Sequence, residues 1–177
     1  MKHSLLLWLF ISPLAFAQPL KLDSLDKLAS KATETVKVTL DNKLLGLAAR
    51  FLSNDDPDEG QVKQLVKGLK GIYVRSFEFS NTGQYADSDL DAIRKQLRDS
   101  SWKPIVEVHG KDENDNTDVY IKDEGDHYAG MAIVSAEPKQ LTVVHIDGVI
   151  DLDGLSKLAG NFGIPDDIRS KTERKHK

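Results

Sequence analysis

The sequence of 177 residues contains no cysteine. A chain without cysteine forms no disulfide, offers no thiol nucleophile and holds no cysteine-ligated metal. Its stability therefore has to come from packing, and its cellular compartment has to be inferred from other features.

Long apolar runs are also missing, with one exception close to the start. A short, mildly basic segment (residues 1–4) precedes the apolar run Leu5–Ala17, which ends in Ala15-Phe16-Ala17. This pattern is typical of a signal peptide, and we expect cleavage before Gln18. The run is too short for a hydrocarbon layer of about 30 Å, which needs about 20 residues. We therefore expect an exported chain, periplasmic or secreted, with no transmembrane span.

The sequence lacks an excess of positive charge. The net charge is −4, and removal of the leader with its single cation Lys2 leaves 160 residues with a net charge of −5. A mildly acidic protein is not expected to bind nucleic acid through its overall field. This length suits one domain with its own core. We expect a signal peptide at 1–17, a single domain at 18–165 and a basic, disordered tail at 166–177.

Catalytic motifs are missing as well. The sequence has no G-x-S-x-G elbow, no P-loop and no G-x-G-x-x-G, and its histidines form no H-E-x-x-H or H-x-H pattern. We therefore assign no catalytic, cofactor-binding or metal-binding residue and expect no cofactor.

What is present is a regular alternation of helical and strand patterns. Apolar residues recur with helical spacing, Leu22, Leu25, Leu28 and Ala29 facing inward in the first such segment, and they alternate with polar residues elsewhere. We predict helices at 22–32, 42–52, 61–71, 87–101 and 151–162, and strands at 34–40, 72–80, 102–110, 116–125, 127–138 and 140–148. The last four strands are joined by short connections, which favours an antiparallel meander. The fold class is therefore α+β, a two-layer sandwich with helices packed on one face of a mostly antiparallel sheet.

The segment Lys111–Tyr120 raises the question of calcium. Oxygen-bearing side chains occupy every second position, at Asp112, Asn114, Asn116 and Asp118. A helix-loop-helix calcium site also needs Gly at position six and Glu at position twelve, where this chain has Thr117 and Asp123. Asp and Asn are also preferred residues of hairpin loops, which need no metal. We interpret the segment as a hairpin tip and keep weak calcium binding as an open alternative.

A second alternative involves three strand residues. Glu107 and His109 share a face of one strand because they are two residues apart, and His145 lies on another strand. If these strands pair suitably, an imidazole and a carboxylate could meet on the open face of the sheet and serve acid/base chemistry or hold zinc.

Two strand features favour structural roles. Gly130 lies inside a predicted strand, which indicates a bulge or a close approach, with a helix packed over it as the ordinary explanation. Arg75 lies among the alternating rings of Tyr73, Phe77 and Phe79, and we expect it at the edge of that face with its stem over apolar surface.

The order of these pieces resembles a bacterial family known as domain of unknown function 4252. The resemblance rests on three stretches: "LVKGLKGIYVRSFEF", "SWKPIVEV" and "YAGMAIVSAEPKQLTVVHIDGVIDLDGLSKLAG". Leu69–Tyr73, Trp102 and Gly130–Asp151 match the family's pattern. The resemblance implies an exported single domain in the envelope of Gram-negative bacteria, and it supplies no catalytic residue.

The function we expect is a non-enzymatic binding or protein-interaction domain that meets an envelope protein or peptide. A sheet face or an open strand edge would make the contact, the latter by strand addition. The alternatives are a metal-dependent or acid/base enzyme with a site on the open sheet face, and a weak calcium-binding protein.

Overall fold

The computed structural model describes residues 19–52, 57–110 and 116–152. The predicted leader, the tail and all but the first two residues of the predicted helix 151–162 lie outside these ranges. The predicted domain boundaries therefore stay predictions.

In the described ranges, six antiparallel strands form one open sheet, in the order β1-β2-β6-β5-β4-β3. The strands are β1 (Glu34–Asp41), β2 (Leu69–Glu78), β3 (Trp102–His109), β4 (Asn116–Asp123), β5 (Tyr128–Glu137) and β6 (Gln140–Gly148). The predicted meander of four strands is confirmed, and β5 lies inside the sheet as its apolar centre indicates. β2 pairs with β6 and carries β1 on its outer side, so β1 and β3 are the two edges.

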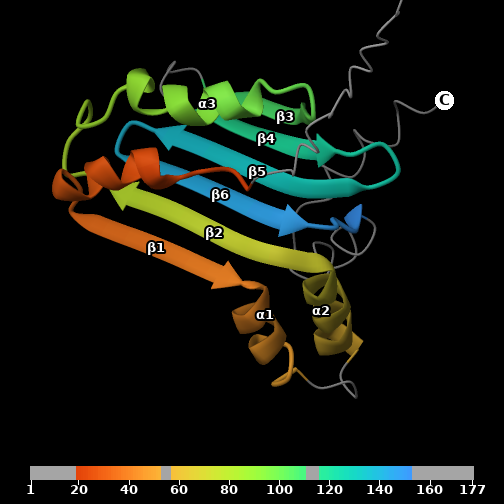
Figure 1. Ribbon diagram of the computed structural model, residues 1–177. Coiled ribbons are helices and arrows are strands. Elements are labelled where there is room, and N and C mark those ends of the chain that lie inside the picture. Colours follow the sequence, from red (N-terminus) through yellow and green to blue (C-terminus); the bar gives the residue numbers. More distant parts are fainter. Residues whose placement is uncertain (1–18, 53–56, 111–115, 153–177) are drawn as a thin grey trace, which may run out of the picture.

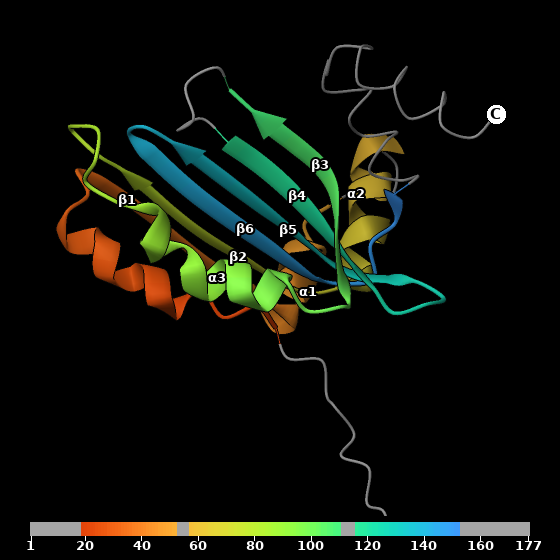
Figure 2. The same cartoon turned by 90° about the horizontal axis from the view of Figure 1, so that it is seen from above.

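Four helices of the described part of the chain pack against this sheet, which confirms the α+β class. They are the 3₁₀ helix η1 (Asp23–Ser30) and the α-helices α1 (Asn42–Ala48), α2 (Pro57–Gly68) and α3 (Asp91–Leu97); a single short turn, η2 (Asp87–Asp89), precedes α3. Figures 1 and 2 show η1 and α3 lying across the same side of the sheet, here called the helix face. The opposite side is called the open face. α1 and α2 lie at the end of the sheet where β1 ends and β2 begins (Figure 1).

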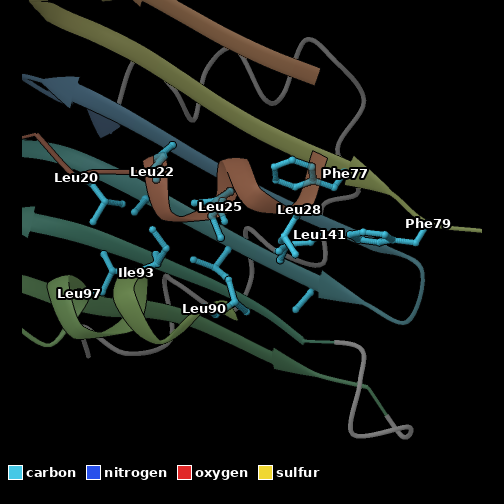
Figure 3. Packing of buried hydrophobic residues seen from close by; sticks show 14 residues of the cluster. Leu20, Leu22, Leu25, Leu28, Phe77, Phe79, Leu90, Ile93, Leu97 and Leu141 are labelled. Carbon is cyan, nitrogen blue, oxygen red and sulfur yellow. The ribbon is translucent and has the colours of Figure 1, made fainter. Parts of the chain in front are cut away.

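The hydrophobic core lies between the helix face of the sheet and the helices η1 and α3. Leu25 and Leu28 of η1 and Ile93 of α3 are fully buried against Phe77 and Leu141 of the sheet (Figure 3). Alternate residues of each strand point to opposite faces, so these core side chains recur every second residue. At about 25 cal/mol per Å² of apolar area, burial of this cluster is the main stabilising contribution to the fold.

The first helix differs from the prediction in its type. An α-helix would place Ala29 on the buried face beside Leu25 and Leu28, but Ala29 is exposed. A 3₁₀ helix has three residues per turn, which aligns Leu22, Leu25 and Leu28 on one side and turns Ala29 outward.

The predicted helix 87–101 is shorter than expected. The backbone N–H and the hydroxyl of Ser101 both donate to the side chain of Asp99, at 3.0 Å and 2.7 Å. These local bonds offer the backbone an alternative to further helical turns, so α3 ends at Leu97 and β3 begins at Trp102.

Gly148 is the last residue of β6 and lies against the end of α2. Its φ of 126° lies in the range that favours glycine, and a Cβ there would lie 2.5 Å from the carbonyl oxygen of Gly68. The neighbouring Val149 N–H donates to that same oxygen at 2.9 Å. This contact fixes the end of α2, and therefore the start of β2, against the end of β6.

Candidate functional site

The most unusual side chain of the helix face is His145 of β6, which is 2 % exposed. Its ring stacks on Tyr73 with the centroids 5.6 Å apart, and it meets Trp102 edge-on at 5.9 Å. The cross-strand neighbours explain this placement, because β6 pairs His145 with Tyr73 on one side and Ala132 on the other. The small Ala132 leaves room for the ring of Trp102.

Gly130 contributes to the same arrangement. A Cβ on Gly130 would lie 3.6 Å from Cη2 of Trp102 and 3.1 Å from the carbonyl oxygen of Ile146. The expected close approach is confirmed. The explanation by an overlying helix is wrong, because the side chain that covers Gly130 is the indole of Trp102 from edge strand β3.

The electrostatic environment keeps the His145 imidazole neutral. Burial, and to a smaller extent the positive charge of Lys122, lower the pKa of His145 from 6.5 to about 4. Lys122 is itself nearly buried, and its Nζ lies 3.7 Å from Oε1 of Glu124. Nδ1 of His145 has no hydrogen-bond partner in the part of the chain that the structure describes. The ring therefore packs as a neutral aromatic group.

The three residues of the acid/base alternative do not come together. Glu107 and His109 lie on edge strand β3, and His145 lies on β6 with β5 and β4 in between. Three strand spacings amount to roughly 14 Å, whereas proton transfer needs contacts of about 3 Å. The expectation that they share the open face is also wrong, since the register places all three on the helix face.

A smaller polar group on β3 and β4 was missed by sequence reasoning. Glu107 lies opposite Asp118, and His109 lies opposite Asn116. Oδ1 of Asp118 is buried and has no hydrogen-bond partner among the described residues. Only the pairing register reveals this group, because Glu107 and Asp118 are eleven positions apart in the sequence.

The two calcium candidates that the structure describes belong to a strand. Asn116 and Asp118 lie within β4, so their two-residue spacing follows from strand alternation. Asp112 and Asn114 lie outside the described residues. Strands β3 and β4 flank the segment as antiparallel partners, which supports the hairpin interpretation. In the described ranges, no group of three or more His, Asp or Glu residues could hold a metal ion.

Arg75 does not lie at the edge of its face, as the sequence led us to expect. It is 5 % exposed, and its Nε donates to Oδ1 of Asp26 on η1 at 2.8 Å. Lys37 of β1 donates to the other oxygen of Asp26 at 2.7 Å. Hydrogen bonds from Lys37 and Arg75 lower the pKa of Asp26. This three-residue network ties η1 to both β1 and β2.

The helix α1 has apolar side chains on two sides. Leu45 and Ala49 are buried, whereas Leu44 and Leu47 are 47 % and 50 % exposed. Phe51 follows just after the helix and is 83 % exposed. Leu44 and Leu47 have the spacing of residues that share a helix face, and Phe51 follows the last helical residue, Ala48, by three positions. The outer side of α1 is here defined as Leu44, Leu47 and Phe51.

The outer side of α1 is held in a fixed position. The carboxylate of Asp41, the last residue of β1, accepts a hydrogen bond from the N–H of Leu44 at 2.9 Å and caps α1. Backbone bonds from Arg50 N–H to Leu47 and from Phe51 N–H to Ala48, both 3.1 Å, continue the turn to Phe51. Exposed apolar side chains are therefore presented on ordered backbone.

No helix within the described ranges is long and apolar enough to cross a membrane. Comparisons with curated proteins and with solved structures gave no match. A family model, described as "Domain of unknown function (DUF4252)", matches residues 29–158. Among the described residues this range includes the whole sheet and helices α1, α2 and α3, but only the last two residues of η1. The chain therefore belongs to the DUF4252 family.

Proposed function

We propose that this protein is an exported, non-enzymatic protein-interaction domain and that its partner is a protein or peptide of the cell envelope. The observation that carries the proposal is the outer side of α1. Monomeric proteins expose single apolar side chains commonly, but ordered groups of large ones frequently mark interaction sites.

The energetic argument rests on Phe51 and its two leucine neighbours. An aromatic side chain contributes 150–250 Å² on full burial, as an order of magnitude, and a leucine contributes roughly 1.5–3 kcal/mol when it is fully removed from water. Three such side chains, each 47–83 % exposed in the free chain, would contribute several kcal/mol to a complex. Because α1 is capped and its inner side is packed, little ordering cost would oppose binding.

Export is proposed on the leader pattern of residues 1–17, which places the domain where envelope proteins would meet it. The basic residues Lys43 and Arg50 flank the outer side of α1. We therefore propose a partner that combines an apolar anchor pocket with acidic residues at its rim.

The test is crosslinking in intact cells, affinity purification of the tagged chain and mass spectrometry. We expect a reproducible envelope protein with the unchanged chain, and its loss with Leu47→Glu. The matched control is Val108→Glu, because Val108 is similarly exposed (54 %) but lies on β3 at the far edge of the sheet. Circular dichroism would verify that both variants fold.

A folded and abundant chain that captures no envelope component would contradict the proposal. Equal loss of the partner with both variants would remove α1 as the contact.

A further inference from the structure

The two edges of the sheet differ in how well they could accept another strand. β3 is interrupted, because Pro104 lacks an N–H and a bulge shifts the register between Pro104 and Val106. Such features block strand addition at sheet edges. β1 has neither: it pairs with β2 through eight consecutive residues, Glu34–Asp41, without a register shift.

The free side of β1 carries no further strand among the described parts of the chain, as Figure 1 shows. Its side chains form two rows. Val36, Val38 and Leu40 lie on the open face, and Val36 is 42 % exposed. Thr35, Lys37 and Thr39 lie on the helix face, where Lys37 is held by Asp26. A regular edge strand of this kind presents unpaired backbone groups to a partner strand.

We propose that β1 pairs with β1 of a second copy of this chain, antiparallel and with Val38 opposite Val38 of the second copy. The two sheets then form one continuous sheet around a two-fold axis. This register places Val36 opposite Leu40 of the second copy, so the apolar row of the open face continues across the junction. It involves seven positions of each strand, 35–41.

Charge and length of pairing together favour this register over its neighbours. With Val38 at the centre, Lys37 lies opposite the neutral Thr39 of the second copy and diagonal to both its Asp41 and its Lys37, so no charges lie directly opposite each other. A shift by two positions in one direction places Lys37 opposite Lys37, and like charges directly opposite are destabilising. A shift in the other direction places Lys37 opposite Asp41 of the second copy, but it reduces the paired stretch to five positions.

A register shifted by one position is disfavoured for two reasons. In either direction it turns the open face of one copy to the other side of the sheet, and in one direction it also places Glu34 opposite Asp41 of the second copy. Only the register centred on Val38 combines an unbroken apolar row, no opposed like charges and the longest pairing.

The cysteine-free sequence makes a direct test available. Cells expressing the full chain as Val38→Cys are treated with a mild oxidant, and the dimer band is measured on a non-reducing gel. Directly opposed positions in an antiparallel pair have Cβ atoms about 4.5–5.5 Å apart, close to what a disulfide needs, whereas diagonal positions lie about 7–8 Å apart. We expect a covalent dimer for Val38→Cys, and none for Thr39→Cys or for Val108→Cys on the other edge.

A mixture of two variants tests the register independently. Val36→Cys and Leu40→Cys, expressed together with different tags, should give a mixed dimer, while neither alone gives a dimer. A dimer band for Thr39→Cys in place of Val38→Cys would overturn the register, and an equal band for Val108→Cys would overturn the assignment to β1.

The association itself is measured by sedimentation of the purified chain at about 100 µM, because small interfaces often belong to weak complexes. We expect a dimer mass for the unchanged chain and for Val108→Lys, and a monomer mass for Val38→Lys, which places two cations opposite each other. A monomeric unchanged chain together with no Val38→Cys crosslink would overturn the proposal. The edge of β1 is separate from the outer side of α1, so dimer formation and partner capture can fail independently.

Discussion

The buried His145 should make the protein lose stability in mild acid. In the unfolded chain an imidazole has a pKa of about 6.5, whereas burial lowers the pKa of His145 to about 4. Between these two values the unfolded chain binds a proton that the folded chain does not bind. The contribution of His145 to the free energy of unfolding is therefore fully present above pH 6.5 and is lost as the pH falls toward 4.

The magnitude follows from the size of the shift. One pKa unit corresponds to 1.36 kcal/mol, so a lowering from 6.5 to about 4 corresponds to about 3 kcal/mol, lost at up to roughly 1.4 kcal/mol per pH unit. Full conversion is justified because only 2 % of His145 is exposed. The pKa of Asp26 lies below 3.8, so its contribution to the free energy of unfolding is lost mainly at more acidic pH than the range between 6.5 and 4 in which the contribution of His145 is lost.

The assay is urea unfolding at pH 7.0, 6.0, 5.0 and 4.5, followed by the fluorescence of Trp102, whose ring lies 5.9 Å from that of His145. We expect the free energy of unfolding to fall by about 2–3 kcal/mol over this range for the unchanged chain. His145→Phe keeps an aromatic ring against Tyr73 and should remove most of this dependence. His109→Gln, on the exposed edge strand, should keep it.

A free energy of unfolding that stays level from pH 7.0 to 4.5 would refute this reasoning. The same conclusion would follow if His145→Phe folded normally and kept the full dependence.

Three further substitutions test the fold, each by urea unfolding at pH 7. Asp26→Asn should cost about 1–2 kcal/mol, because it leaves the Arg75 guanidinium nearly buried without its anion; the half-exposed position of Asp26 (39 %) reduces the larger cost of a buried pair. Gly148→Ala should destabilise by more than about 2 kcal/mol, because its φ is positive and the new Cβ would meet backbone at 2.5 Å, whereas Gly83→Ala, with a φ of 81° and open space, should cost only about 1 kcal/mol. Tyr85→Phe should cost about 1 kcal/mol by removing a hydroxyl that donates at 2.5 Å to the carbonyl oxygen before the β5–β6 turn. Equal effects of the two glycine substitutions, or no effect of the others, would contradict these assignments.

Local sequence patterns predicted the strands of the C-terminal half well. Short polar connections separate these four strands, so neighbours along the chain become neighbours in the sheet. The pairing of β2 with β6 was not predictable in this way, because Phe77 and Leu141 meet across 64 positions of sequence.

The side of the sheet that His145 occupies was not predictable either. In β6 the row Leu141, Val143 and His145 is buried, while the row that contains Val144 and Ile146 is only partly buried. Both rows are largely apolar, so hydrophobicity alone would turn the histidine outward. The rings of Tyr73 and Trp102 decide the outcome, and they reach His145 only through the tertiary pairing of the strands.

The interrupted edge at β3 has a consequence for assembly. A chain with two equally regular edges could add copies at both ends and grow without limit into a fibre. Here a junction at β1 would pair the regular edge strand of both copies with each other. The outer ends of the joined sheet would then both be β3 edges with Pro104 and a bulge. Two-fold symmetry closes such a dimer, and Pro104 of each copy would prevent a third copy from adding to the sheet.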